Sequence, residues 1–348
     1  SVDVGKVSSD VKFQGKQLNR FAANSQWKQA IDFLRASGSV DVVLWKTALM
    51  ACSNAMRAEE AYKLHAEMVA KGIEPTTDTF NSAMSACAKG DRSDLAQRLY
   101  REMEEAGCEK NEKTFGLYAQ ALGKGGQWEA LEELVGALKK QGFSKSMAIY
   151  GALMRAYFEG NMPEKSLELF DEMSDLGIRP NFSAYYNGIM AAKALRDPKR
   201  CQALFEELLE VDPGRVTSRE YTIVMASVGH AGDLREAFQL FEDMKKNNIR
   251  PNSYTYNALM NVCGKSGKWQ KALELLDEML MHGIQPNEQS FLACCMACER
   301  ARELKLVMRL RNEMYGLGIE PGDRLQELFE RVALKLQESN SNQRRYDY

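Results

Sequence analysis

Apolar side chains recur along the chain at the spacing of one helix face, and they do so in pairs of segments. In the stretch 253–287, one apolar stripe runs over 256–263 and a broader one over 269–280. The sequence Gly-Lys-Ser-Gly-Lys separates the two stripes. Gly283 and then Pro286 follow the second stripe, where a helix C-terminus is expected. The pattern predicts two antiparallel helices joined by a tight connection.

The same two-helix pattern is copied along almost the whole chain. Aromatic residues mark its first helix at intervals of 35 residues, with one interval of 36: Trp45, Phe80, Phe115, Tyr150, Tyr186, Tyr221, Tyr256 and Phe291. A Met or Leu follows each aromatic by 23 residues: Met68, Met103, Leu138, Met173, Leu209, Met244, Met279 and Met314. A period of this length predicts an all-α solenoid, in which each unit buries its apolar face against its neighbours.

Composition narrows the classes of function. Lys+Arg 46 against Asp+Glu 48 gives a net charge of −2, which argues against a strongly basic nucleic-acid binder but allows a basic stripe on one face. No apolar run is long enough to span a membrane. No targeting pattern is visible and the chain does not begin with Met, which is typical of a processed or trimmed form.

The eight cysteines do not form a disulfide framework. Cys52, Cys87, Cys263 and Cys298 each follow their aromatic by seven residues, so they share one position on the buried side of a helix. Cys295 and Cys298 also form a Cys-x-x-Cys pair, but no second pair and no His stands nearby. We therefore expect buried thiols, with no metal and no cofactor.

The repeat resembles a known family. The sequence of 255–287, TYNALMNVCGKSGKWQKALELLDEMLMHGIQPN, looks like a near-consensus pentatricopeptide repeat of the P type, with aromatic-Asn at its start and Gly-Ile-x-Pro-Asn at its end. The resemblance implies a right-handed superhelical solenoid. It divides the chain into an N-terminal extension (1–16), a degenerate repeat (17–41), eight repeats, a capping helix (323–337) and a polar tail (338–348) that we expect to be disordered. The eight repeats are 42–76, 77–111, 112–146, 147–182, 183–217, 218–252, 253–287 and 288–322.

Members of the family bind single-stranded RNA with about one nucleotide per repeat. The resemblance implies that two residues of each repeat read a base: the residue after the aromatic and the last residue of the repeat. The base-reading candidates are Asn81 with Asn111, Asn187 with Thr217, Thr222 with Asn252, and Asn257 with Asn287. The weaker candidates are Lys46 with Thr76, and also Ser146 and Asn181, whose partners Gly116 and Gly151 cannot read a base edge. Leu292 cannot read a base edge either. By the family pattern, Thr222 with Asn252 favours adenine, Asn187 with Thr217 leans to a pyrimidine, and the two Asn pairs favour pyrimidines, cytosine first.

A second group of candidates stands nine residues after the aromatics, where the family often places a phosphate-binding Lys. These phosphate-contact candidates are Lys89, Lys124, His230, Lys265 and Arg300. Glu159 and Leu195 interrupt the series in repeats four and five. The alternative is that the Lys and Asn residues are solvated side chains or helix caps.

Catalysis is not expected, because His65-x-Glu67 and the Cys-x-x-Cys pair both fall inside repeats and no catalytic domain remains. Three hypotheses stay open. The first is an organellar factor that stabilises, processes or activates transcripts by binding RNA alone. The second is a subunit of an organellar ribosome or other ribonucleoprotein, and the third is a protein-binding scaffold. We expect a monomer outside any complex, in a mitochondrion or plastid.

Overall fold

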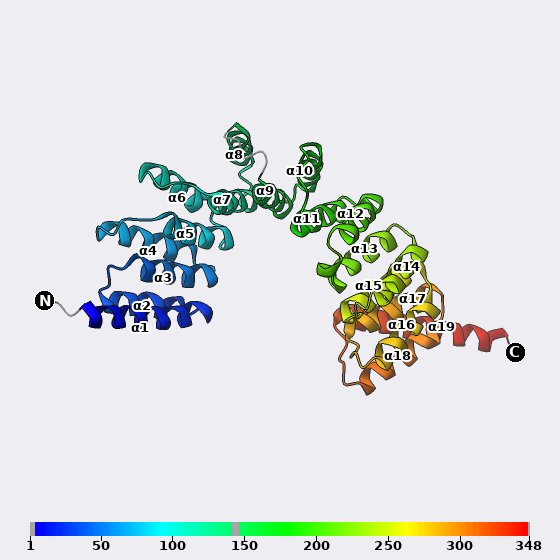
Figure 1. Ribbon diagram of the computed structural model, residues 1–348. Helices are drawn as coiled ribbons and strands as arrows, with labels where there is room; N and C mark the ends of the chain where they lie inside the picture. The colour runs from blue at the N-terminus through cyan, green and yellow to red at the C-terminus, as the bar shows by residue number, and fades with distance from the viewer. Residues whose placement is uncertain (1–3, 141–145, 347–348) are drawn as a thin grey trace. The chain divides into compact units, whose positions relative to one another are not determined.

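The computed structural model describes the backbone of residues 4–140 and 146–346, and the side chains of 12–140 and 146–338 (Figure 1). Every long regular element in these ranges is an α-helix. The described chain divides into two compact units, residues 1–191 and 192–348. The prediction of an all-α repeat solenoid is confirmed.

The helices come in pairs that follow the predicted repeats. The first unit holds α1 (Val4–Ala23), α2 (Trp27–Ser37), α3 (Val42–Asn54), α4 (Ala58–Ala70), α5 (Thr77–Lys89), α6 (Ser93–Glu105), α7 (Glu112–Lys124), α8 (Trp128–Lys140), α9 (Met147–Glu159), α10 (Pro163–Asp175) and most of α11 (Phe182–Ala194). The second unit holds α12 (Pro198–Val211), α13 (Ser218–His230), α14 (Leu234–Lys246), α15 (Ser253–Ser266), α16 (Trp269–Met281), α17 (Glu288–Arg300), α18 (Leu304–Gly316) and α19 (Asp323–Tyr346). Odd-numbered helices from α3 to α17 are the first helices of the eight repeats.

Local capping explains why the first helices begin where they do. Asn252 lies before α15 in an extended conformation, and its side chain accepts a hydrogen bond from the backbone N–H of Thr255. The Thr255 side chain bonds back to the backbone of Asn252, which completes a capping box. Thr76, Asn111, Thr217 and Asn287 cap their helices in the same way. The last residue of each of these repeats is therefore the N-cap of the next repeat.

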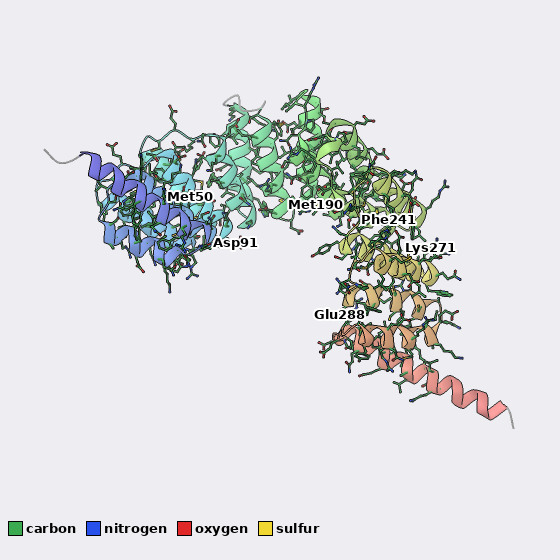
Figure 2. The ribbon with its side chains drawn as sticks, turned by 60° about the horizontal axis from the view of Figure 1, so that its bottom comes forward. Met50, Asp91, Met190, Phe241, Lys271 and Glu288 are labelled. Carbon is green, nitrogen blue, oxygen red and sulfur yellow. The ribbon has the colours of Figure 1, made fainter. Side chains whose placement is uncertain are left out.

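The predicted core positions are buried except in repeat five, where Leu209 is only partly buried and its neighbour Leu208 is fully buried. Trp45, Tyr221 and Tyr256 are at most 1% exposed, and Met68, Met103, Met173, Met244, Met279 and Met314 are fully buried. Rings of successive repeats meet edge to face: Phe205 lies 4.8 Å from Tyr221, and Phe241 lies 5.5 Å from Tyr256 (Phe241 is labelled in Figure 2). The apolar seam therefore runs continuously from repeat to repeat within each unit.

The cysteines are part of this core. Cys52, Cys87, Cys263, Cys294, Cys295 and Cys298 are fully buried free thiols. Burial raises the pKa of Cys52 to about 12 and that of Cys298 to about 11, so these sulfurs stay protonated. Among the described residues, no three His, Cys, Asp or Glu side chains are grouped closely enough to hold a metal ion.

No helix in the described part of the chain is both long and apolar enough to cross a membrane.

The fifth repeat has a different register from the predicted one. Asn181 caps α11 through its bond from the backbone N–H of Ala184, and four residues later Tyr185 is 5% exposed and packs against Phe170 at 5.3 Å. Tyr186, which we assigned to the buried aromatic position, is only partly buried. The aromatic of repeat five is therefore Tyr185, and the interval of 36 residues separates it from the aromatic of repeat six. The prediction that Tyr186 is this aromatic, and that repeat four ends at residue 182, was wrong.

The two ends of the chain are more helical than predicted. Helix α1 begins at Val4, inside the segment that we separated as an N-terminal extension, and pairs with α2. Helix α19 continues to Tyr346 and includes most of the tail that we expected to be disordered. After Gly322 the sequence contains no Gly and no Pro, so it lacks the residues that usually end a helix.

Candidate functional site

The base-reading candidates lie at the start of the first helices, where one repeat meets the next. Asn81 on α5 is fully buried, and its Nδ2 donates to Oδ1 of Asn111 at 3.3 Å. Thr114 Oγ1 on α7 donates to Oδ1 of Asn81 at 2.8 Å. Asn111 Oδ1 also accepts the backbone N–H of Thr114 at 3.0 Å. The two predicted partners are therefore brought together, and the pair bridges α5 and α7.

Repeat seven has the same geometry. Asn257 is 9% exposed, its Nδ2 donates to Asn287 Oδ1 at 3.1 Å, and Ser290 Oγ donates to its Oδ1 at 2.6 Å. Asn111 and Asn287 are themselves exposed, and neither Nδ2 donates to another side chain or carbonyl of the described ranges. Because an amide nitrogen carries two N–H groups, these caps present free donors to solvent while their oxygens hold the helix start.

The adenine candidate of repeat six is built differently. Thr222 is partly buried, and its Oγ1 donates to the backbone carbonyl of Ser218 at 2.6 Å and lies 3.0 Å from Thr255 Oγ1. The cap Asn252 is exposed, and its Nδ2 donates to Ser218 Oγ at 2.9 Å. The Thr222 and Asn252 side chains are thus tied to the same two residues, Ser218 and Thr255, rather than to each other.

The candidate of repeat five changes with the register. Asn187 is 5% exposed and donates from Nδ2 to the backbone carbonyl of Gly151 at 3.3 Å, so it follows the buried aromatic by two residues instead of one. Tyr186 occupies the position after the aromatic. Thr217 is an exposed N-cap whose Oγ1 donates to Glu220 at 2.7 Å. Asn187 and Thr217 therefore do not occupy matching reader positions.

The weaker candidates also have local partners. The Lys46 ammonium forms an ion pair with Asp78, and Ser146 Oγ donates to Glu112. Thr76 and Asn181 are N-caps, and Asn181 Oδ1 accepts the Ala184 N–H at 2.9 Å. The carboxylates of Asp78 and Glu112 partly neutralise this edge of repeats one to three, which weakens it as an anion-binding surface.

The phosphate-contact candidates lie exposed at the C-terminal ends of the first helices. Lys89 and Lys265 form no ion pair with the described residues, Lys124 pairs with Asp91 at 3.2 Å, and Arg300 donates to the backbone carbonyl of Lys265. Partial burial of the His230 ring, with Lys265 and other cations nearby, lowers the pKa of this exposed residue, so its imidazole is neutral at pH 7. The corrected register places Ala194, rather than Leu195, nine residues after Tyr185.

Two basic residues in this region were missed by the sequence reasoning. Lys193 and Arg196 follow Tyr185 by 8 and 11 residues, and both lie close enough to His230 to lower its pKa. They were missed because neither stands nine residues after the aromatic of repeat five, whichever tyrosine is taken as that aromatic. The second unit therefore carries a basic cluster of Lys193, Arg196 and Lys265 around His230, with Arg300 bonded to the Lys265 carbonyl.

These features define a helical-repeat protein whose polar side chains are displayed at fixed intervals along a stack of paired helices. The family profile described as the PPR repeat family matches residues 40–89, 218–265 and 255–298, and the profile described as PPR repeat matches 78–108 and 148–178. Together the matches cover more than half of the chain, and the protein belongs to the pentatricopeptide repeat family.

Solved structures show the same fold. The crystal structure of the pentatricopeptide repeat protein PPR10 from maize aligns with a TM-score of 0.61 at 17% identity, covering 94% of this chain and 49% of that one. PPR10 in complex with an 18-nt psaJ RNA element aligns with a TM-score of 0.52 at 17% identity, covering 88% and 48%. This chain thus spans about half the length of the maize protein. A search of curated protein sequences finds no significant match.

Proposed function

We propose that this protein binds single-stranded RNA along the first helices of its repeats and acts by binding alone. The observation that carries the proposal is the recurrence, in repeats two and seven, of a buried Asn bonded to an exposed cap Asn with free N–H donors. Family membership and the RNA bound by maize PPR10 support the ligand class. Cytosine and uracil present carbonyl acceptors on their pairing edge, which suit amide donors.

The basic residues supply the affinity in this proposal. Lys89 and Lys124 lie on neighbouring repeats of the first unit, and Lys265 and Arg300 on neighbouring repeats of the second. Each ion pair between such a cation and a phosphate releases a counterion, so the logarithm of the binding constant falls with the logarithm of salt concentration by about 0.7 per ion pair for single strands.

The first test removes these four cations. Replacing Lys89, Lys124, Lys265 and Arg300 with Ala should weaken binding of an RNA pool and reduce the salt slope by about 0.7 for each phosphate that no longer meets a cation. The matched control removes four exposed cations from second helices: Lys63, Arg98, Arg235 and Lys305. An equal decrease of the slope in both variants would mean that net charge, and not this face, attracts the RNA.

Selection from a random RNA pool tests base reading. We expect an enriched motif with an adenine followed by a pyrimidine, read by repeats six and seven. Exchanging Thr222 for Asn should change the preferred base at one position only, because the other caps keep their bonds. An unchanged motif in this variant would show that repeat six does not read a base.

A structural role in a larger ribonucleoprotein is the second candidate. The observation that favours it is that neither the phosphate-contact candidates nor the base-reading candidates continue through every repeat. Glu159 stands in place of a cation and accepts a hydrogen bond from Gln120 at 3.0 Å, and Gly116 and Gly151 have no side chain to read a base with. Salt-sensitive RNA binding without a motif would favour this candidate, and no RNA binding at low salt would leave a protein scaffold. We propose that either role is carried out in a mitochondrion or plastid; family membership supports this location, and imaging of the tagged protein tests it.

A further inference from the structure

Three ion pairs join successive second helices, and two of their carboxylates also accept a hydrogen bond from the first-helix tyrosine of their own repeat. An acidic residue, 22 positions after the aromatic, accepts a bond from a basic residue on the preceding second helix. The bridges are Arg35 to Glu67 at 2.7 Å, Lys139 to Glu172 at 2.8 Å and Lys245 to Glu278 at 2.8 Å. They join α2 to α4, α8 to α10, and α14 to α16.

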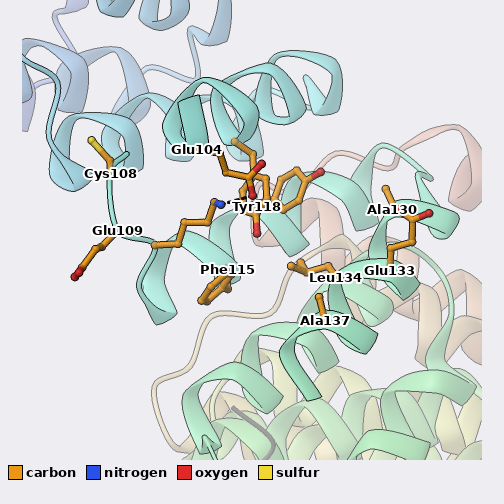
Figure 3. Close-up of a pocket in the computed structure, with 11 residues that line it drawn as sticks. Glu104, Cys108, Glu109, Phe115, Tyr118, Ala130, Glu133, Leu134 and Ala137 are labelled. Atoms are coloured by element: carbon orange, nitrogen blue, oxygen red, sulfur yellow. Dashed lines mark hydrogen bonds and ion pairs between the residues drawn. The ribbon is translucent and has the colours of Figure 1, made fainter. Parts of the chain in front are cut away.

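The bridge is missing at several junctions, since Val69 and Leu280 occupy the basic position on α4 and α16, and the junction between α6 and α8 is one of them. The acidic position on α8 is occupied by Ala137, and the position on α6 that corresponds to Lys139 and Lys245 is occupied by Glu104. A cavity of about 580 Å³ lies at this junction (Figure 3). Phe115, Leu134 and Ala137 form part of its apolar lining.

Two aromatic rings, one on α6 and one on α7, and a lysine from the connection between these helices also line this cavity. At other junctions the residue 20 positions after the aromatic packs on the aromatic of the next repeat, as Phe170 does on Tyr185 at 5.3 Å. Here Tyr100 is stacked on Tyr118 at 4.0 Å with 13° between the rings. Lys110 Nζ lies 4.4 Å from the centre of the Tyr100 ring and forms an ion pair with Glu104. This site therefore already holds one ammonium group by a ring face and a carboxylate.

The charge around the cavity is otherwise negative. Glu109 and Glu133 also line it, and their carboxylates form no ion pair with the described residues. Lys110 neutralises only one of the three carboxylates. An RNA backbone is repelled by such a surface, whereas a positively charged side chain is attracted.

We propose that the cavity between α6 and α8 docks a basic segment of a partner protein by taking up an arginine or lysine side chain. The aliphatic stem of this side chain lies along Leu134 and Ala137, and its charged end pairs with Glu133. The proposal goes beyond RNA binding and does not depend on it, because the carboxylates that line the cavity repel a phosphate backbone.

The test follows the methyl carbons of Ala130 and Ala137 by NMR in the full chain. The probe is the peptide acetyl-Leu-Arg-Leu-Arg-Leu-amide, and its comparison peptide has citrulline, which is neutral and of the same shape, in place of arginine. The arginine peptide should shift the Ala137 methyl and bind about tenfold more tightly than the citrulline peptide. An unshifted Ala137 methyl, or equal binding of the two peptides, would overturn the proposal.

Two variants and one control locate the site. Glu133→Gln should weaken the arginine peptide about three- to tenfold, and Ala137→Phe, which fills the cavity from an exposed helix position, should weaken it at least as much. Glu105→Gln removes an exposed carboxylate from α6 that does not line the cavity, and should change the affinity less than twofold. Equal effects of the Glu133 and Glu105 variants, or a shift of Ala137 caused by RNA or by self-association, would contradict docking of a basic peptide.

Discussion

Lowering the pH should weaken the first unit through a single buried histidine. His65 on α4 is 1% exposed, its ring centre lies 4.4 Å from that of Phe80, and its Nε2 has no hydrogen-bond partner among the described residues. Burial lowers its pKa from the ordinary value of 6.5 to about 4. The folded state therefore binds fewer protons than the unfolded state at every pH between these two values. Stability is full above pH 6.5 and is lost as the pH falls toward 4.

The size of the loss follows from the two pKa values. One pKa unit corresponds to about 1.4 kcal/mol, so the full cost of keeping His65 neutral approaches ~3 kcal/mol below pH 4. At pH 5 the cost is about 2 kcal/mol relative to pH 7.5. The carboxylates that are paired in the folded state add their losses mainly below pH 4.5, because Glu299 and Asp94 have pKa values of about 2. Between pH 5 and 6.5, the change in the free energy of unfolding therefore comes from histidine and not from these carboxylates.

The variant His65→Phe isolates this effect. Phe occupies the same repeat position in α10, α12 and α14, as Phe170, Phe205 and Phe241, so the ring should pack on Phe80 without a titrating group. Urea unfolding at pH 7.5 and 5.0 should show a loss about 2 kcal/mol smaller in the variant than in the native chain. His282→Gln, at an exposed position, should not change the difference.

Repeat proteins can unfold in parts, so amide exchange in α4 and α5 should accompany the urea curves. An equal pH dependence in the native chain and in His65→Phe would refute the argument, because it would show that His65 is not the group that binds the proton.

Two further predictions concern packing and the C-terminal helix. A Cβ at Gly123 would lie 2.3 Å from the Ala156 carbonyl oxygen, so Gly123→Ala should lower the free energy of unfolding in the urea assay by about 1–3 kcal/mol. A Cβ at Gly136 on α8 would meet open space, so Gly136→Ala should raise the free energy of unfolding by roughly 0.5–1 kcal/mol in the same assay. Glu299 accepts two hydrogen bonds from Arg331, at 3.0 and 2.9 Å. The variant Glu299→Gln should therefore speed amide exchange in α19 and leave amide exchange in α3 unchanged. Unaltered exchange in α19 would show that apolar contacts alone hold that helix.

Most of the fold could be predicted because one structural unit is copied many times. The aromatic residue that recurs about every 35 residues shows where each first helix lies. The Gly that opens a Gly-Ile-x-Pro segment, or the Asn that stands in its place, shows where the second helix ends. Each copy supports the interpretation of the others, so a single degenerate repeat does not obscure the pattern. This redundancy is why the burial of the aromatic, Met and Cys positions followed directly from their spacing.

The error in repeat five has a physical cause. Two adjacent tyrosines fit the aromatic position, and the resemblance of Asn187 to Asn257 favoured Tyr186. One extra residue between a cap and its aromatic would rotate the following side chains by about 100° and move them off the buried face. The structure places the extra residue after Tyr185 instead, in a repeat where α12 has 14 residues and a 3₁₀ turn, Pro213–Arg215, follows it. A longer helix end and a turn accommodate it without disturbing the seam.

The surroundings of the candidate readers could be predicted only in part. The sequence placed Asn81 and Asn257 at a helix start, where they could equally have been solvated side chains. Their burial depends on how closely the next first helix approaches, and their partners Thr114 and Ser290 belong to that next helix. Neither the approach nor the hydrogen-bond directions are encoded within a single repeat.

The hydrogen bonds at these junctions make the candidate readers part of the packing between repeats. A buried amide costs about 1–3 kcal/mol if its partners are removed, so the Asn81 and Asn257 networks also hold neighbouring repeats together. The junction between α7 and α9 is built from small residues instead. There Gly116 and Gly123 allow close approach, since a Cβ at Gly116 would lie only 3.1 Å from that of Ala152. A larger side chain introduced at Gly116 must therefore push the two helices apart.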